Sequence, residues 1–180
     1  QPFVGLGGCG TAMEVRAWRM SAKAFDVLKV SPVLGRSFSA DEDEASGPRS
    51  VIISDILWRN CFSRSETAVG RQMYIDGEPY TVVGVMPDTF EFPALIGRDK
   101  PPLWLSLNLM AGQAADRKAR SLSIIARLRP GVTLPEAQSE MTAIGAQLAK
   151  AFPAENGEEP GIVVSPLGNP HHVEDTKRIL

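Results

Sequence analysis

The chain has 180 residues, of which 43% are hydrophobic and 22% are charged, and its formal net charge at pH 7 is −2. This composition is typical of a soluble globular protein, and the length is enough for one domain or two small lobes. The small net charge gives no reason to expect a nucleic-acid surface, and no apolar run approaches the roughly 18 residues of a membrane-spanning helix. The chain starts at Gln1 without a Met or a leader peptide and stops abruptly at Leu180, which suggests an excised piece of a longer protein.

The first segment predicts one strand and one short helix. Residues 1–11 are rich in glycine and predict a loop. Residues 13–20 alternate as a strand does, and the pattern leaves open which face is buried. Ser21 is placed to cap a short helix over residues 22–29.

The next segment predicts a buried strand followed by a capped helix. Ser39 and Glu42 have the spacing of a capping box. Residues 50–54 (SVIIS) are a short apolar run typical of a buried strand. Ser54 then caps a helix over residues 55–62. The apolar side of this helix is predicted to consist of Ile56, Leu57, Cys61 and Phe62.

A hairpin over residues 70–87 (GRQMYIDGEPYTVVGVMP) is the clearest predicted element. Residues 72–75 and 80–85 have strand character, and the Asp76-Gly77 pair between them tolerates the positive φ of a tight turn. Gly84 leaves room for another backbone to approach closely. The shared face is predicted to carry Met73, Ile75, Val83 and Val85.

The segment that follows predicts two loops around a short strand. Residues 87–102 are rich in proline and predict a loop in which Phe90 and Phe92 point inward. Residues 103–107 (LWLSL) predict a strand, and residues 108–119 predict a mobile surface loop.

Residues 120–165 predict a strand, a helix and a second strand. Residues 120–129 alternate, and Thr133 with Glu136 forms a capping box for a helix that ends near Ala151. Residues 161–165 (GIVVS) are the second strand, and this succession suggests an α+β layer. The apolar stripe of the helix is predicted to consist of Leu134, Ala137, Met141, Ile144, Leu148 and Phe152.

No group of residues assembles a catalytic, cofactor or metal site. The acidic run of Asp41, Glu42, Asp43 and Glu44 could bind a cation or supply an acid and a base, but such a run is typical of a solvated helix start. His171 and His172 could ligate a metal, but the spacing HExxH is absent and no Cys accompanies them. The sequence contains no nucleotide-binding GxxxxGK[ST] loop and no GxSxG serine motif. The residues alone therefore indicate a non-catalytic module without a cofactor.

Cys9 and Cys61 are the two cysteines of the chain. The two cysteines can form a disulfide if the protein lies outside the cytoplasm. The apolar helical context of Cys61 instead favours a small buried side chain. Cysteine usage alone does not decide the compartment.

Four stretches of the chain, in order, carry a resemblance to a known family. They are residues 20–38 (MSAKAFDVLKVSPVLGRSF), residues 51–70 (VIISDILWRNCFSRSETAVG), the hairpin continued by DTFEFP, and residues 126–148 (ARLRPGVTLPEAQSEMTAIGAQL). Together they resemble the periplasmic core domain of MacB-like ABC transporter permeases, the FtsX-like/MacB permease family. The resemblance departs from the family pattern at Lys29, where the family has Gly, and at Ala24, where members often have an aromatic residue.

The resemblance implies an α+β fold with two lobes. Residues 1–20 and 120–168 would form a porter-like βα layer, incomplete at its N-terminus. Residues 21–119 would form an inserted mixed α/β lobe, which we call the Sabre-like lobe. Residues 169–180 would begin a helix that leads to a membrane span.

The resemblance also implies a function. The domain would stand at the periplasmic face of the inner membrane, without catalytic activity, and would couple ATP-driven motion of membrane helices to efflux or other envelope work, a process called mechanotransmission. The implied partners are an ABC ATPase outside this chain, the flanking membrane helices, and a periplasmic adaptor or outer-membrane protein. No nucleic acid is implied; the full-length permease would be a dimer and the isolated domain a monomer.

One alternative from a different class is an extracytoplasmic module that binds a ligand or envelope component with residues 87–102 and 108–119. An enzyme ranks third, because no catalytic constellation is present.

Overall fold

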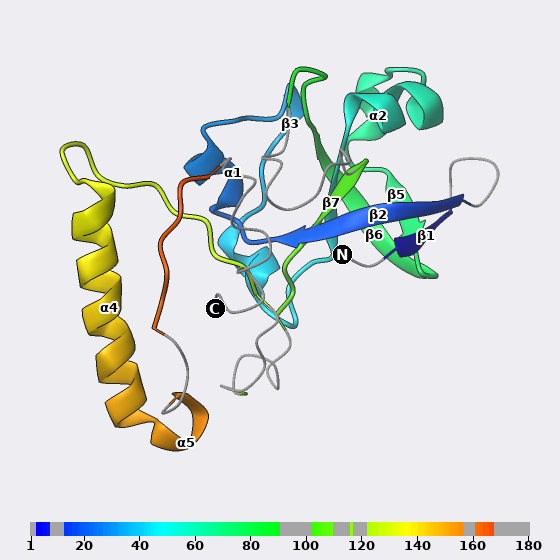
Figure 1. Cartoon of the computed structure of the whole chain (residues 1–180). Helices are drawn as coiled ribbons and strands as arrows, with labels where there is room; N and C mark the ends of the chain where they lie inside the picture. Colours follow the sequence, from blue (N-terminus) through cyan, green and yellow to red (C-terminus); the bar gives the residue numbers. More distant parts are fainter. Residues whose placement is uncertain are drawn as a thin grey trace. The chain divides into compact units, whose positions relative to one another are not determined.

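The computed structural model describes residues 3–7, 13–90, 102–109, 116, 122–156 and 161–167. The chain divides into two compact units (Figure 1). The first unit is Gln1–Phe92 with Asp99–Ala111, and the second is Pro93–Arg98 with Gly112–Leu180.

The first unit is built on one sheet that closes on itself. Its order is β3-β6-β4-β7-β2-β1-β5, and because β5 also pairs with β6, the strands from β6 round to β5 form a ring. The pairs β2–β7 and β4–β6 are parallel, and the other pairs are antiparallel. Closure leaves few unpaired sheet edges. The strands are β1 Phe3–Gly7, β2 Met13–Met20, β3 Leu34–Gly35, β4 Ser50–Ile53, β5 Gln72–Ile75, β6 Glu78–Val85 and β7 Leu103–Ser106.

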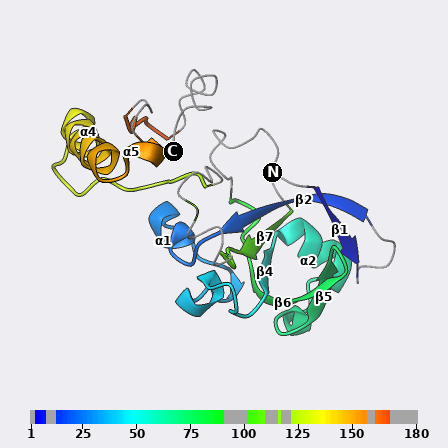
Figure 2. The same cartoon turned by 90° about the horizontal axis from the view of Figure 1, so that it is seen from below.

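Helix α2 (Asp55–Phe62) covers the core enclosed by these strands, which curve around it in Figure 2. Ser54 caps the helix as predicted, and its Oγ accepts a hydrogen bond from Leu57 N–H at 3.3 Å. Leu57 is buried, but Ile56 is 58% exposed, so its predicted place on the apolar side is wrong. The core consists of Val4, Leu6, Ala17, Val51, Ile53, Leu57, Met73, Ile75, Tyr80, Val82, Val85, Leu103 and Leu105.

An aromatic cluster packs on the other face of the sheet. Phe25, from α1 (Ala24–Leu28), lies at its centre and is fully buried. Its ring centroid is 6.0 Å from those of Phe38 and Trp104 and 6.1 Å from that of Phe90. The inward position predicted for Phe90 is therefore confirmed, whereas Phe92 lies outside the described residues.

Helix α1 is shorter than predicted and is not capped by Ser21. Its N-cap is Lys23, which makes no side-chain capping hydrogen bond. Lys29 follows the last turn with φ 56°, in the left-handed region. Lys29 thus adopts the conformation that glycine favours, at the position where the family pattern has Gly.

The predicted hairpin is confirmed, with a shift of one strand boundary. Ile75 pairs with Glu78, so β6 begins two residues earlier than predicted and the loop is Asp76-Gly77. The φ angles of these two residues are 52° and 82°, as a tight hairpin turn requires. Asp76 Oδ1 also accepts a hydrogen bond from Gly5 N–H at 2.8 Å.

A bulge in β6 changes which residues face the core. Met73 pairs with Tyr80, so its face continues through Tyr80 and Val82, and the prediction for Val83 is wrong. Along β4, the partner of Val51 is Val82 while the partner of Ile52 is Gly84, which leaves Val83 as an extra residue. The extra residue inverts the alternation, and Val85 therefore returns to the core as predicted.

The close approach predicted at Gly84 is confirmed. A Cβ at this position would lie 2.5 Å from the carbonyl oxygen of Arg36. Gly84 pairs with Gly35 of β3, so two glycines allow β3 to lie against β6.

Helix α4 (Leu134–Ala151) dominates the second unit and is followed by α5 (Pro153–Asn156). The predicted capping box is confirmed, because Thr133 N–H donates to Glu136 Oε2 at 2.7 Å and Glu136 N–H donates to Thr133 Oγ1 at 3.4 Å. The predicted stripe holds only in part: Ala137 is buried, but Ile144 and Leu148 are 37% and 36% exposed.

The described parts of the two strands predicted beside α4, residues 122–129 and 161–165, do not form strands. In the described part of the chain, residues 122–129 and 161–165 have no strand pairing. Ile124 is 82% exposed, so the alternation of residues 122–128 does not bury one face. An alternating pattern becomes a strand only when a second strand supplies the hydrogen bonds.

The strand pairing bears on the predicted lobes. β1 and β2 hydrogen-bond with β5 and β7, within the first unit. The assignment of residues 1–20 to the lobe of residues 120–168 stays a prediction. Residues 169–180 lie outside the described part of the chain.

Candidate functional site

The acidic run Asp41–Glu44 is the first sequence-predicted candidate, and it is not a solvated helix start throughout. Glu42 lies in a 3-10 helix, Ala40–Asp43, and is fully buried. Its Oε1 accepts from Arg36 Nη2 at 2.8 Å, and its Oε2 accepts from Arg36 Nη1 at 3.0 Å. Oε2 also accepts from Ser39 N–H at 2.7 Å, and Oε1 accepts from the Ser50 hydroxyl. Sequence reasoning found the capping box but missed Arg36 and Ser50.

The hydrogen bonds determine the charge state of Glu42. Burial alone would raise the pKa of its carboxyl, but the hydrogen bonds from Arg36, Ser50 and Ser39, together with the charge of Arg36, lower the pKa to about 2. Glu42 is therefore ionised at neutral pH with its lone pairs occupied. Such a carboxylate is held as a structural anion and is a poor acid, base or cation ligand.

The neighbouring acid Asp43 also serves the backbone. Ala22 N–H donates a bifurcated hydrogen bond to the Asp43 carboxylate, at 2.9 Å to Oδ1 and 3.1 Å to Oδ2. The pKa of Asp43 is raised, because burial outweighs the hydrogen bond from Ala22. Asp43 O also accepts from Leu109 N–H at 2.8 Å, so the first residues of the predicted loop 108–119 are held in place.

No metal site emerges from the described residues, where no three His, Cys, Asp or Glu side chains gather. His171 and His172 lie outside those residues.

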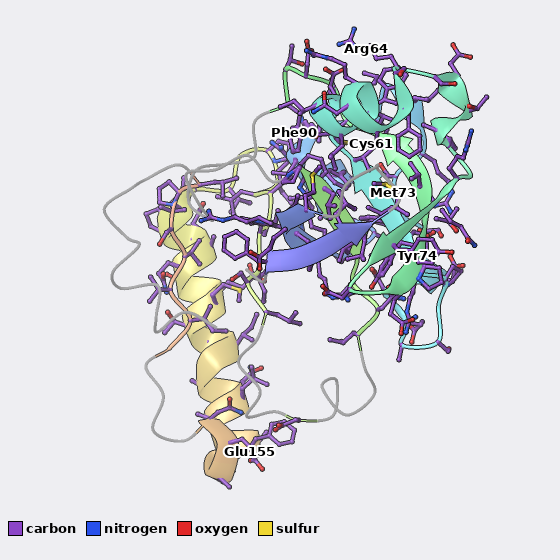
Figure 3. All side chains as sticks on the ribbon, turned by 90° about the vertical axis from the view of Figure 1, so that its right-hand side faces the viewer. Cys61, Arg64, Met73, Tyr74, Phe90 and Glu155 are labelled. Carbon is purple, nitrogen blue, oxygen red and sulfur yellow. The ribbon has the colours of Figure 1, made fainter. Side chains whose placement is uncertain are left out.

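A second buried carboxylate fixes α2. Asp55 accepts hydrogen bonds from Arg59 Nη2 at 2.7 Å and from Arg64 Nη2 at 2.8 and 2.9 Å. These bonds lower the pKa of Asp55. Arg64 follows the helix, as Figure 3 shows, so the network ties the first turn of α2 to the residues after its last turn.

Cys61, on α2, is disulfide-bonded. Of the two interpretations that the sequence left open, a disulfide and a small buried side chain, Cys61 has the disulfide, and its side chain also packs partly against the core. The other cysteine of the chain, Cys9, lies outside the described residues. No local signal around a cysteine reports a covalent bond to a distant part of the chain.

Apolar side chains reach the surface of the first unit at the strands β1 and β5. Phe3 is 56% exposed and Tyr74, marked in Figure 3, is 48% exposed. Gly7 pairs with Tyr74, and the Arg16 guanidinium lies 5.2 Å from the centroid of the Phe3 ring. A cation–π contact of this kind covers one side of an exposed ring. Sequence reasoning did not single out these residues.

None of the described helices is both long enough and apolar enough to cross a bilayer.

Comparisons with known proteins bear on this geometry. A family model described as the MacB-like periplasmic core domain matches residues 3–144. The curated proteins contain no match. Among solved structures, the periplasmic region of MacB from Actinobacillus actinomycetemcomitans is 16% identical with a TM-score of 0.56, and the match covers 85% of this chain and 65% of that chain.

Two further solved structures are similar. A domain of a protein assigned as a permease from Porphyromonas gingivalis is 14% identical with a TM-score of 0.52, covering 81% of this chain and 67% of that one. The extracellular domain of the ABC-type transporter YknZ from Gram-positive bacteria is 14% identical with a TM-score of 0.45, and the match covers 63% of this chain and 54% of that one. The chain thus spans between about half and two thirds of these solved domains.

The sheet and helices described above agree with the mixed α/β fold of the MacB periplasmic region, and the family model covers residues of both units. Because the family model matches residues 3–144, well more than half of the sequence, this chain belongs to the family of MacB-like periplasmic core domains.

Proposed function

We propose that this domain is a non-catalytic part of an ABC transporter permease and transmits ATP-driven motion of membrane helices to work outside the membrane, such as efflux. The family match over residues 3–144 is the observation that carries the proposal. The ATPase would be another chain or another domain, in keeping with a sequence that contains no GxxxxGK[ST] loop.

A mechanical role needs stiff bodies that move as units. The first unit has a closed sheet, an internal core and two buried carboxylates that bind arginines. Such a body resists local deformation, so a force applied to it displaces the whole. Two compact units joined by a few segments are the arrangement from which hinge and shear motions arise.

The two-lobed description belongs to this proposal. We propose the lobes as the resemblance implies them, with residues 1–20 and 120–168 in the porter-like layer and residues 21–119 in the Sabre-like lobe. Residues 122–129 and 161–165 have no strand partner in the described part of the chain, which is in keeping with a layer whose strands pair with other parts of the protein.

An extracytoplasmic location follows from the family and is supported by Cys61. Disulfides persist in oxidising compartments such as the periplasm and are rare in the cytosol. Cys61 is disulfide-bonded, as expected for a domain outside the cytoplasm. The partners proposed with this location are the membrane helices of the permease, its ATPase, and a periplasmic adaptor or outer-membrane protein.

Distance measurements in the intact permease test the proposal. Spin labels at Gln72→Cys in the first unit and Glu140→Cys in the second use two exposed positions. We expect the distance distribution between the labels to change when ATP is added and to stay unchanged when the ATPase carries an inactivating substitution. An identical distribution with and without ATP in the active permease would refute mechanotransmission through this domain.

The alternative of a ligand-binding module rests on residues 87–102 and 108–119, of which 91–101, 110–115 and 117–119 lie outside the described residues. A thermal-shift screen separates the two functions, because a ligand that binds only the folded state raises its melting temperature.

A further inference from the structure

One side chain of α4, that of Gln138, binds the backbone of residues 161–165 as a neighbouring strand would. Gln138 Nε2 donates to the carbonyl oxygen of Ile162 at 2.8 Å, and Gln138 Oε1 accepts from Val164 N–H at 2.7 Å. In a parallel sheet, the N–H and C=O of one residue bind the residues before and after the one they face. The Gln138 amide makes the same pair of bonds to the two neighbours of Val163. We call this pair of hydrogen bonds the Gln138 clamp.

The clamp is the polar link between the helix and this segment. Among the described residues, no other hydrogen bond joins α4 to residues 161–167. Two helical turns further on, a Cβ at Gly145 would lie 3.6 Å from Ile162 N and 3.8 Å from Gly161 Cα. The segment therefore runs antiparallel to α4, as Figure 1 shows beside the yellow helix, and a small residue lets it lie close.

The segment itself behaves as a strand held on one side only. Ile162 and Val164 are half-buried, while Val163 between them is 45% exposed. This alternation is that of a strand with one covered face. Loss of the Gln138 side chain therefore removes these hydrogen bonds between the segment and α4 without affecting any sheet.

We propose that Gln138 is the positioning residue that holds residues 161–165 on α4, and that the clamp passes displacement of this segment to the helix. The second half rests on the proposed function, in which the chain beyond residue 168 leads to a membrane span. A moving span would then pull on residues 161–165, and the clamp would carry the pull into α4.

Gln suits this position because one amide offers a donor and an acceptor side by side. Leu has a similar size and offers neither. An ionised Glu offers acceptors only and would face the Ile162 carbonyl with like partial charge. A protonated Glu again has one donor and one acceptor, so Gln138→Glu should restore the clamp in acid and lose it at neutral pH.

The introduced carboxyl is the group that titrates at this place. The residues three and four positions away on α4 are Leu134, Pro135, Met141 and Thr142, and residues 161–167 carry no ionisable side chain. Gln138 Nε2 also donates to Thr142 Oγ1 at 3.0 Å, which does not titrate. α5, which packs against α4, carries Glu155.

Amide hydrogen exchange at Val164 tests the clamp in this chain. We expect Gln138→Leu to lower the protection factor of the Val164 amide about fivefold to tenfold, the effect of losing one or two net hydrogen bonds. Gln138→Glu should lose protection at pH 7 and regain it near pH 3.5. The control Gln147→Glu, at an exposed position of the same helix, should leave Val164 unchanged.

Unchanged protection in Gln138→Leu, or equal protection of Gln138→Glu at both pH values, would overturn the clamp. The coupling is tested in the intact permease with the labels at positions 72 and 140. The ATP-dependent distance change should be lost in Gln138→Leu and kept in Gln147→Glu. If the ATP-dependent distance change persists in Gln138→Leu, the proposed coupling is overturned. If the wild-type permease shows no ATP-dependent distance change, the proposed function is overturned, while the hydrogen-exchange test of the clamp is unaffected.

Discussion

Replacement of Glu42 by Gln should destabilise the first unit in a pH-dependent way. The Glu42 side chain is 1% exposed and is bound by Arg36, whose side chain is 53% exposed. Gln has nearly the same shape as Glu but no charge, so it resembles the protonated carboxyl. The substitution therefore removes the charged hydrogen bonds while leaving little cavity. The stability that is lost is the part that the ionised carboxylate contributes beyond the protonated one.

The size of the effect follows from the pKa. The folded protein holds the pKa of Glu42 at about 2, below the ordinary value of 4.5. Because the pKa is lowered on folding, the stabilisation is fully present above about pH 4.5 and is lost as the pH falls through 2. A shift of one pKa unit corresponds to about 1.4 kcal/mol, and solvent around Arg36 screens part of the interaction. We therefore expect the free energy of unfolding of Glu42→Gln to be lower by roughly 2 to 3 kcal/mol at pH 7.

Urea unfolding followed by tryptophan fluorescence measures this difference, because Trp18, Trp58 and Trp104 all lie in the first unit. The free energies of unfolding of the wild type and Gln variant should differ most at pH 7 and converge towards pH 2. Glu78→Gln is the matched control, since Glu78 binds Arg49 in a pair whose side chains are 57% and 49% exposed. Exposed pairs contribute less than about 1 kcal/mol. A difference between wild type and Glu42→Gln that does not shrink in acid would refute this account.

Three further substitutions have defined outcomes in the same urea assay or by hydrogen exchange. Lys29→Gly should raise the free energy of unfolding by roughly 0.5 to 1 kcal/mol, because φ is 56° there, and Lys29→Ala, which keeps a Cβ, should not. Gly84→Ala should destabilise by about 1 to 3 kcal/mol or more, because the new Cβ would lie 2.5 Å from Arg36 O, whereas Gly161→Ala meets no atom within 4 Å and is the control. Thr133→Ala should cost about 1 kcal/mol of local stability, seen as faster amide exchange in the first turn of α4, and equal exchange rates would contradict the capping role.

The elements predicted correctly from the sequence carry their own local chemistry. Asp76-Gly77 supplies two residues that tolerate positive φ, and Ser54 and Thr133 supply oxygens for the first N–H groups of their helices. Each of these signals acts within four residues. The hairpin, α2 and α4 therefore have nearly the bounds that the sequence indicates.

The failures arise where a distant segment decides the outcome. The alternation over residues 122–128 is the same whether or not a second strand is present, so the pattern alone could not reveal the missing pairing. The bulge at Val83 depends on the register between β4 and β6. Glu42 looked like part of a solvated acidic run because Arg36 and Ser50, which bury and pair it, come from outside that run.

The residues that carry the family resemblance explain why it identifies a fold more readily than a site. Within residues 20–38, Phe25 and Phe38 meet in the aromatic cluster, and a Cβ at Gly35 would lie 2.2 Å from Val83 O. Arg36 of the same stretch binds Glu42. Each of these residues holds the first unit together, so a substitution there should lower stability before it alters any coupling. The coupling proposed for the Gln138 clamp rests instead on two hydrogen bonds outside the first unit, where a substitution should alter the coupling without unfolding the sheet.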